Sequence, residues 1–279
     1  MGTKDLLKEY NLSRQCDNLY PKILIPLRIQ EALLAEQSLG RAKTADRFGE
    51  LSGWAVALGA ISLATPVGWL GLIGAGAAIF YDSTEGYQER KSTVEEENKR
   101  ARQILSDPEL LRKYMQSQLK STLQTTRSSL TKSDARSGKY DDVLLNAVRA
   151  IPGCLVKKGE GLNLSYTFTP DVILHIPSLN LWIDIEVDEP WFLSDSGQKE
   201  PIHYIGKDDY RDQQFYDARW IVIRFAEEQI AKQPASCAKE VAKLLSLFNV
   251  DASQLFQTTP DLKPVERWNY ETALEMHRY

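Results

Sequence analysis

The chain has 279 residues, a length that accommodates two domains, each with its own hydrophobic core. Its formal net charge is −4, and the acidic excess lies in residues 138–279, so this half is not expected to hold a polyanion by bulk electrostatics. Three scattered cysteines without a CxxC or Cys/His pattern argue against structural zinc, and together with the mixed, charged N-terminus they favour a cytoplasmic location.

The N-terminal part of the chain predicts helices around a long apolar run. From Pro26 to Leu51, helix-forming residues carry apolar side chains at three- and four-residue spacing. Residues 51–81 carry no charge, and the run exceeds the roughly 20 residues that span a bilayer as one helix. Pro66 divides it, so we predict an apolar helical hairpin. Three interpretations remain open: one kinked membrane helix, a hairpin inserted into one leaflet, or a buried hairpin packed against its own chain or another copy.

Basic residues flank the apolar run on both sides, and the positive-inside rule then favours both ends on the cytoplasmic side, as in a hairpin. Residues 82–130 return to a charged helical pattern, with a break at Asp107-Pro108. A polar stretch follows and is typical of a linker. We therefore predict a helical region over residues 1–130, a linker over 131–139 and a second domain over 140–279.

The second domain alternates helical and extended patterns. In chain order, we predict a helix at 140–150, strands at 154–157, 166–176 and 181–188, a helix at 208–218, a strand at 220–225 and a helix at 227–248 interrupted near Pro234. A short helix is expected near the C-terminus. This order predicts a mixed sheet flanked by helices, of the α+β or α/β class.

The strand from Leu181 carries an unusual row of charges. Side chains alternate along a strand, so Asp184, Glu186 and Asp188 share one face while apolar residues occupy the other. Adjacent carboxylates repel and raise one another's pKa, and a divalent cation such as Mg²⁺ would neutralise them. The alternative is an edge strand whose acidic face is in water.

The preceding strand adds Pro170-Asp171, and a short turn at 177–180 makes the two strands a predicted hairpin. A proline-aspartate on one strand and Glu186 on the next resembles the PD-(D/E)XK nuclease superfamily. The acidic segment is similar to the branch related to very-short-patch repair endonucleases, in which a strand ends in Glu-Val-Asp or Glu-Ile-Asp. The segments that carry the resemblance are IDIEVDEPW, PIHY at 201–204, YRDQQF at 210–215 and WIVIRFAEEQI at 220–230. Together they cover about half of the chain, from residue 140 onward, and imply a restriction-endonuclease-like sheet.

The resemblance also implies a metal site. Asp171 and Glu186 would bind Mg²⁺ or Mn²⁺, with a backbone carbonyl near Val187 as the third protein ligand. The superfamily usually has a lysine two residues after the glutamate, where this chain has Asp188. This departure leaves the group that activates the water unassigned. Asp188 itself is a further candidate ligand or catalytic residue.

Other candidate residues follow the acidic strand. His203 could serve as acid or base because its intrinsic pKa is near neutral, or could form a structural hydrogen bond. Lys207, Arg211 and Gln214 are spaced to share one face of a helix and are candidates for contacting phosphate. For Arg211, a structural ion pair with Glu189 or Asp188 is the alternative.

Two classes of function remain open. The first is a metal-dependent endonuclease acting on DNA, whose N-terminal region localises or oligomerises it, an architecture that would suit a prokaryotic defence effector. The second is a catalytically inactive nuclease-fold protein that binds a partner or a membrane. The carboxylate row favours the first class, and the missing lysine and the acidic domain favour the second. Removing Asp171 or Glu186 is expected to leave thermal stability equal or higher, because repulsion is relieved.

Overall fold

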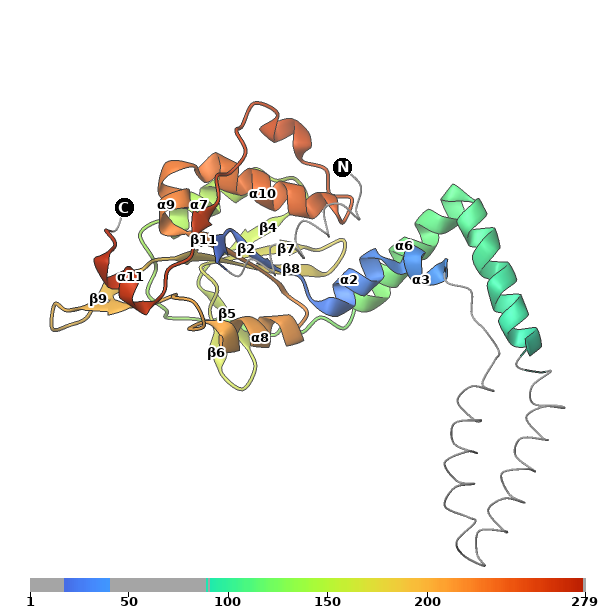
Figure 1. Ribbon diagram of the computed structural model, residues 1–279, viewed down its shortest axis with the longest axis horizontal. Helices are drawn as coiled ribbons and strands as arrows, with labels where there is room; N and C mark the ends of the chain where they lie inside the picture. The colour runs from blue at the N-terminus through green and yellow to red at the C-terminus, as the bar shows by residue number, and fades with distance from the viewer. Residues whose placement is uncertain (1–17, 41–88, 90, 278–279) are drawn as a thin grey trace, which may run out of the picture. The chain divides into compact units, whose positions relative to one another are not determined.

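The computed structural model describes residues 18–40, 89 and 91–277, and it has a mixed α+β fold (Figure 1). Two compact units are formed, one by Met1–Leu34 with Gln116–Tyr279 and the other by Ala35–Met115. In the second unit, α3 (Ala35–Leu39) and residues 91–106 are helical, and α6 (Pro108–Leu123) starts after the predicted break. The predicted hairpin at 51–81 lies outside the described residues. Within the described part of the chain, no helix combines the length and apolarity needed to cross a membrane.

A five-stranded mixed sheet forms the centre of the first unit. Its strand order is β2 (Lys22–Leu24), β11 (Ile221–Ala226), β8 (Leu181–Asp188), β7 (Val172–Ile176) and β4 (Leu155–Lys157). The β8–β11 pair is parallel, and the other pairs are antiparallel. The predicted hairpin is confirmed, because β7 and β8 pair across a turn at 177–180. The predicted order of helices and strands after residue 140 is confirmed as well, with additional short strands.

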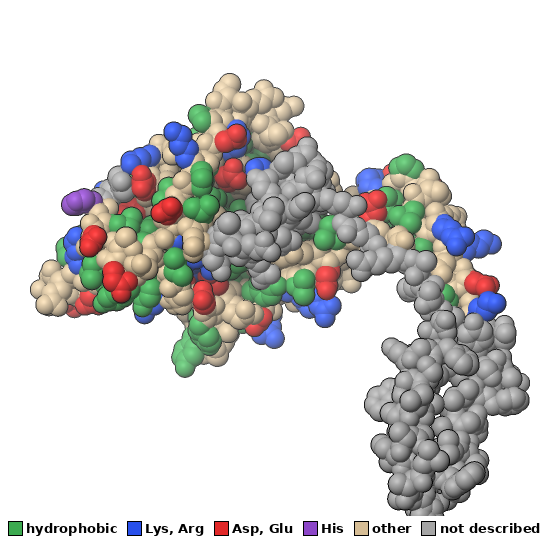
Figure 2. Space-filling model, viewed as in Figure 1, with side chains coloured by type: hydrophobic (Ala, Val, Ile, Leu, Met, Phe, Trp, Pro, Cys, Tyr) green, Lys and Arg blue, Asp and Glu red, His purple; other side chains and the backbone are tan. Residues whose placement is uncertain are grey.

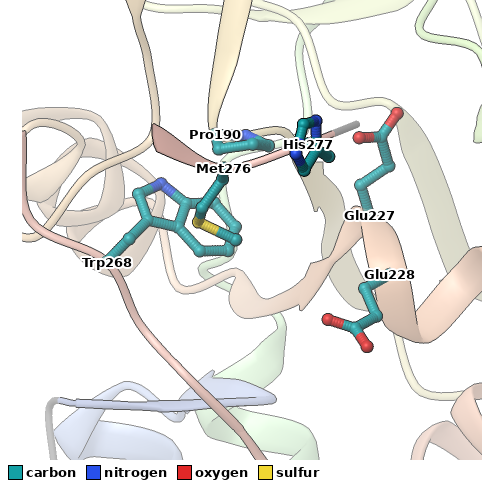
Figure 3. A pocket seen from close by; sticks show the side chains of 6 residues that line it. All are labelled: Pro190, Glu227, Glu228, Trp268, Met276 and His277. Atoms are coloured by element: carbon teal, nitrogen blue, oxygen red, sulfur yellow. The ribbon is translucent and has the colours of Figure 1, made fainter. Parts of the chain in front are cut away.

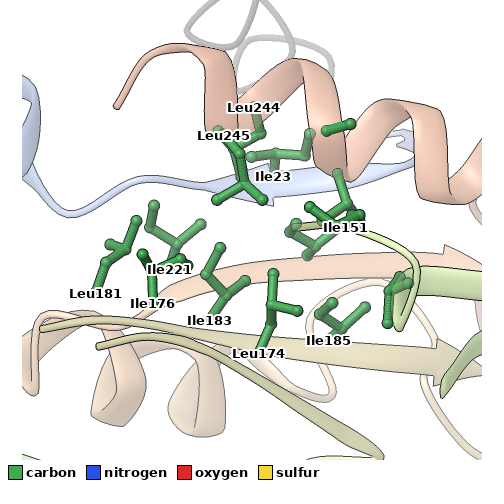
Figure 4. Close-up of a cluster of buried hydrophobic side chains, with 14 of the residues drawn as sticks. Ile23, Ile151, Leu174, Ile176, Leu181, Ile183, Ile185, Ile221, Leu244 and Leu245 are labelled. Carbon is green, nitrogen blue, oxygen red and sulfur yellow. The ribbon is translucent and has the colours of Figure 1, made fainter. Parts of the chain in front are cut away.

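One face of the sheet packs against helices α7 (Asp141–Val148), α9 (Glu227–Lys232) and α10 (Pro234–Ser246). Ile183 and Ile185 point from β8 toward this layer, where Leu244 and Leu245 of α10 meet them (Figure 4). Each such side chain is fully or almost fully buried, a burial that contributes roughly 1.5–3 kcal/mol. This face contains the main hydrophobic core of the protein.

The other face carries the acidic row and is also covered. Helix α8 (Asp209–Asp217) and a second sheet, of β3 (Leu130–Lys132), β5 (Glu160–Asn163) and β6 (Thr167–Phe168), belong to this side (Figure 1). Trp182, Phe215 and Trp220 form a smaller apolar cluster there. Strand β8 is central, and all eight of its residues are buried, so the edge-strand interpretation is wrong.

The N-terminal residues enter the first unit, which differs from the predicted limits of 1–130 and 140–279. Strand β1 (Leu19–Tyr20) pairs with β12 (Val265–Glu266), and β2 forms an edge of the main sheet. Residues 131–132, placed in the predicted linker, belong to β3. Strands of two or three residues are too short to show a period in the sequence, which explains the difference. The helix predicted from Pro26 is present as α2 (Leu27–Leu33).

The remaining elements are small. The segment predicted as a loop at 189–207 contains a hairpin of β9 (Trp191–Leu193) and β10 (Lys199–Pro201). After α10, a 3-10 turn (Ser253–Phe256) leads to β12 and to α11 (Tyr270–Glu275), the predicted C-terminal helix.

Candidate metal centre

Asp171 and Val187 are joined where β7 and β8 separate. The ladder between the two strands ends at the pair Val172–Ile185, so the amide of Val187 has no partner in β7. The side chain of Asp171 supplies one, because its Oδ2 accepts a hydrogen bond from the Val187 N–H at 2.8 Å. Burial raises the pKa of the Asp171 carboxyl, and the nearby charge of Glu186 raises it further. The structure therefore brings together the three residues predicted to hold a metal.

Glu186 is paired with Arg211 of α8. Arg211 Nη2 donates to Glu186 Oε1 and also to the backbone oxygen of Thr169, the latter at 2.7 Å. Burial alone would raise the pKa of Glu186, but the positive charges of Arg211 and Arg224 outweigh it and lower the pKa. The structural partner of Arg211 is thus Glu186, and the predicted pairing with Glu189 or Asp188 is wrong.

Two further carboxyl groups lie around this pair with unused oxygens. Asp184 is fully buried, its carboxyl group lies within hydrogen-bonding reach of the Glu186 carboxylate, and neither of its oxygens accepts a hydrogen bond from a donor among the described residues. Its pKa is raised by burial and then by Glu186. Asp141, at the start of α7, accepts a hydrogen bond from the Gly138 N–H at 2.8 Å through Oδ2, while its buried Oδ1 has no partner within the described chain. The charge of Asp141 also raises the pKa of Asp171.

This donor set suits a hard divalent cation. Asp141, Asp171, Asp184 and Glu186 lie close enough to affect one another's pKa, and the nearest cations are Arg211 at Glu186, Arg224 behind it and Lys158, which lies 3.4 Å from Asp141 Oδ2. A buried carboxylate without a partner is strongly destabilised, and it either takes up a proton or binds a cation. Oxygen ligands from carboxylates are those that Mg²⁺ and Mn²⁺ prefer. The orphaned oxygens of Asp184 are therefore consistent with a metal ion at this position.

A second polar cluster adjoins the first. One ligand atom each from Asp188, His203 and Asp208 lie within 4.8 Å of one another, a spacing that could hold a metal ion. Arg224 of β11 is buried here, with Nη1 donating to Asp188 Oδ1 at 2.7 Å and Nε donating to Asp212 Oδ1 at 2.9 Å. His203 Nδ1 lies 3.0 Å from Asp208 Oδ2.

The N-terminal strands complete this second cluster. The Tyr20 hydroxyl donates to Asp188 Oδ2 at 2.9 Å, and Lys22 Nζ donates to Asp212 Oδ2 at 2.8 Å. Burial alone would lower the pKa of His203, but the charges of Asp188 and Asp208 outweigh it and raise the pKa to about 9. At neutral pH the imidazole is therefore a cation. The carboxylates of Asp188, Asp208 and Asp212 are thus each paired with a cation of the protein, and those of Glu189 and Asp209 lie further out, at 3.9 and 3.7 Å from His203 and Lys22.

Two other predicted residues lie apart from the acidic groups. Lys207 is exposed in a turn before α8, where its N–H donates to the Tyr204 backbone oxygen at 2.9 Å. Because α8 begins at Asp209, Lys207 does not share a helix face with Arg211, and that prediction is wrong. Gln214 is half-buried within α8.

Sequence reasoning missed several members of the second cluster. Asp212 directly follows the candidate residue Arg211. An acidic residue on a helix is typical of a solvated face, so the sequence does not indicate that Asp212 is buried. Tyr20 and Lys22 lie more than 150 residues before their partners in the chain, and a local sequence pattern does not predict such long-range contacts. From the sequence, Asp141 at the start of a predicted helix has two interpretations: an acidic residue favoured by the helix dipole, or the extra acidic residue that many members of the superfamily carry at this place. Its buried position beside Asp171 required the tertiary structure.

A small pocket lies elsewhere, between the start of α9 and the C-terminal segment (Figure 3). It is lined by Pro190, Glu227, Glu228, Trp268, Met276 and His277. None of these residues was predicted to bind substrate or metal. On the face shown in Figure 2, Lys and Arg side chains alternate with Asp and Glu, which agrees with the absence of a strong basic excess in the sequence.

Comparison with known proteins identified no relative. No family model, no curated protein and no solved structure matches the chain.

Proposed function

We propose that the protein is a metal-dependent nuclease of the PD-(D/E)XK type that hydrolyses phosphodiester bonds, with DNA as the substrate. The observation that carries the proposal is the buried excess of carboxyl groups around Asp171 and Glu186, including the two orphaned oxygens of Asp184. The order of elements from α7 to α10, with a parallel β8–β11 pair, is the order that the resemblance implies. Asp171 directly precedes β7 and Glu186 lies on β8, and this arrangement supports the proposal.

In this proposal Asp171, Glu186 and the backbone carbonyl of Val187 hold Mg²⁺ or Mn²⁺. The N–H and C=O of a residue in an antiparallel ladder point to the same side, so this carbonyl shares the side on which the Val187 N–H meets Asp171. When bound, the cation polarises the phosphate and lowers the pKa of a bound water. The phosphorus–oxygen bond to water would form as the bond to one sugar oxygen breaks; the water would release its proton to solvent, and the sugar oxygen would take up a proton.

His203 is the candidate donor of that proton. Its pKa of about 9 makes it an imidazolium at neutral pH, so it can give a proton but is poorly suited to accept one. The positive charge of His203 also lowers the pKa of both Asp171 and Glu186, which indicates that it lies near them. We therefore assign His203 the role of acid rather than base.

The alternative is a nuclease-fold protein without catalysis. The observation that favours it is the Glu186–Arg211 ion pair, which satisfies Glu186 without a metal. Asp188 likewise stands in place of a lysine and is occupied by Arg224 and Tyr20. In either case the N-terminal region, with its apolar run, would localise or oligomerise the protein, through a membrane or a second copy, and a role in prokaryotic defence fits the first case.

Cleavage assays with matched carboxylate variants test the proposal. Purified protein should cleave duplex DNA, single-stranded DNA or RNA in Mg²⁺ or Mn²⁺ but not in EDTA. Asp171→Asn and Glu186→Gln should abolish cleavage, whereas Asp142→Asn, at a neighbouring carboxylate that is 78% exposed, should not. Cleavage that survives Asp171→Asn would show that the site is wrong. If wild-type protein cleaves none of these substrates in either metal, the proposal fails and the non-catalytic alternative stands.

A further inference from the structure

Arg211 is held in a fixed orientation beside the proposed metal site. Its Nη2 donates to Glu186 Oε1 and to the Thr169 backbone oxygen, and its guanidinium carbon lies 5.2 Å from the centre of the Phe215 ring. A carboxylate, a carbonyl and an aromatic ring therefore constrain the guanidinium from three directions. The side chain is 21% exposed, so this group remains reachable from solvent.

One buried N–H donor of the Arg211 guanidinium is not used in a hydrogen bond. Arg211 Nε is buried and has no hydrogen-bond partner among the described residues. A guanidinium keeps its charge at all accessible pH values, and its N–H groups form a planar fork that matches phosphate oxygens. A buried donor without an acceptor is unfavourable. The unused Nε–H therefore points to an acceptor that comes from outside the chain.

We propose that Arg211 takes the place of the lysine that the superfamily pattern puts at residue 188, and that its partly exposed guanidinium binds a non-bridging oxygen of the phosphodiester through N–H groups that Glu186 and Thr169 do not use. The inference rests on the proposed function and assigns the cation that the sequence left missing. A carboxylate offers two oxygens, so Glu186 can hold Arg211 through Oε1 and a metal ion through Oε2. The guanidinium and the metal ion would then share the negative charge of one phosphate.

The surroundings of Asp188 explain why the cation comes from another element. The carboxylate of Asp188 receives hydrogen bonds from Arg224 and Tyr20, and Arg224 is fully buried. A lysine at this position would place its ammonium group against the buried guanidinium without a carboxylate between them. The like charges would repel strongly in this low-dielectric setting. Asp188 therefore belongs to the second cluster, and the positive charge beside Glu186 comes from Arg211 of α8.

Binding to a nucleic acid strand tests the proposal without depending on catalysis. Full-length Glu186→Gln and the double variant Glu186→Gln with Arg211→Gln are compared, because both lack the carboxylate charge and differ only at Arg211. The probe is a short fluorescein-labelled DNA single strand in Ca²⁺, followed by anisotropy over a series of KCl concentrations. Loss of Arg211 should reduce the slope of log K against log salt by about 0.7, the value for one phosphate contact. Arg149→Gln, at an exposed arginine bonded to Asn146, should leave the slope unchanged.

Equal slopes for the single and double variants would overturn the proposal. Cleavage gives a second readout in the Glu186 background: Arg211→Gln should lower kcat roughly 10²–10³-fold, and Arg211→Lys should recover part of the loss. If Arg211→Gln keeps wild-type kcat while Asp171→Asn is inactive, the role of Arg211 is refuted and the nuclease assignment stands. If wild-type protein cleaves nothing, the nuclease assignment fails, and the salt slope still decides whether Arg211 contacts phosphate.

Discussion

Asp184 is the residue whose charge is least compensated by its surroundings. It is fully buried on β8, and neither oxygen accepts a hydrogen bond from a donor within the described residues. Burial, reinforced by Glu186, raises its pKa, so folding without a metal ion favours the protonated form of this carboxyl group. A raised carboxyl pKa lowers stability above the pKa of the unfolded chain, about 3.9, and has no effect below it.

Asp184→Asn should therefore stabilise the metal-free protein, because asparagine is neutral and its amide can donate to Glu186. We expect the free energy of unfolding in EDTA to rise by about 2 kcal/mol at pH 7, and the gain to vanish below about pH 4. Urea unfolding over this pH range measures it, with Asp142→Asn as the exposed control. A loss of stability at pH 7 would mean that Asp184 is ionised and compensated.

His203 should contribute stability with the opposite dependence on pH. Its folded pKa of about 9 lies above the unfolded value of about 6.5. The contribution is thus fully present below about pH 6.5 and is lost as the pH rises toward 9. The expected difference in unfolding free energy between wild type and His203→Gln is on the order of 2 kcal/mol at pH 6 and falls toward zero above pH 9. Urea titrations at several pH values measure it, and a difference that stays constant would contradict the Asp188 and Asp208 pairing.

The surroundings of Glu186 change the expected effect of removing this residue on stability. Repulsion between neighbouring carboxylates suggested that removing Glu186 would not reduce stability. The structure instead pairs Glu186 with Arg211, so Glu186→Ala would leave a largely buried guanidinium without its carboxylate. Breaking a buried pair by removing one partner is destabilising, by about 3–5 kcal/mol in fully buried cases. Gln at this position keeps an acceptor for Arg211 and is the better variant for functional tests.

At the scale of elements, strand β2 is the least expected part of the sheet. Ile23 lies in the main core and is 4% exposed, and its backbone pairs with Ile223 of β11. Ile23→Ala should lower the free energy of unfolding by about 2–4 kcal/mol, because it removes buried methyl groups and leaves a cavity. Leu27→Ala, at a 53% exposed position nearby, should change it by less than about 0.5 kcal/mol. Urea unfolding compares the two variants, and equal small effects would mean that the N-terminal strand does not belong to the folded unit.

The long elements of the sheet could be predicted because their patterns are strong. Strand β8 alternates apolar and acidic residues over its whole length, and Pro234 marks the boundary between α9 and α10. The same pattern placed Asp171 and Glu186 on neighbouring strands. The burial of the acidic face could not be predicted, because it depends on α8 and on the sheet of β3, β5 and β6. Those elements cover β8 from segments whose own patterns are weak.

At the scale of the whole molecule, the two compact units interrupt one another along the chain. The first unit combines Met1–Leu34 with Gln116–Tyr279, so residues 35–115 are an insertion within it. The N-terminal strands contribute Tyr20 and Lys22 to the polar cluster beside the metal centre. A fragment starting at residue 140 would lack these two side chains as well as β2. The predicted division at residues 130–140 therefore does not separate independent parts of the protein.

The acidic balance of the second half also has a consequence at this scale. Because residues 138–279 carry an acidic excess, a nucleic acid would be held by local contacts and by the metal ion rather than by a broad positive surface. The proposed function thus depends on where the metal ion binds. Two clusters compete for it: the group around Asp171 and Glu186, and the group of Asp188, His203 and Asp208.

Titration with Mn²⁺, followed by the loss of the free-ion signal in electron paramagnetic resonance, distinguishes the two clusters directly. We predict that wild-type protein binds Mn²⁺ and that Asp171→Asn and Glu186→Gln each weaken binding at least about tenfold. His203→Gln and Asp208→Asn should leave binding unchanged. Unchanged binding in Asp171→Asn, together with its loss in His203→Gln or Asp208→Asn, would place the metal ion in the second cluster and contradict the account.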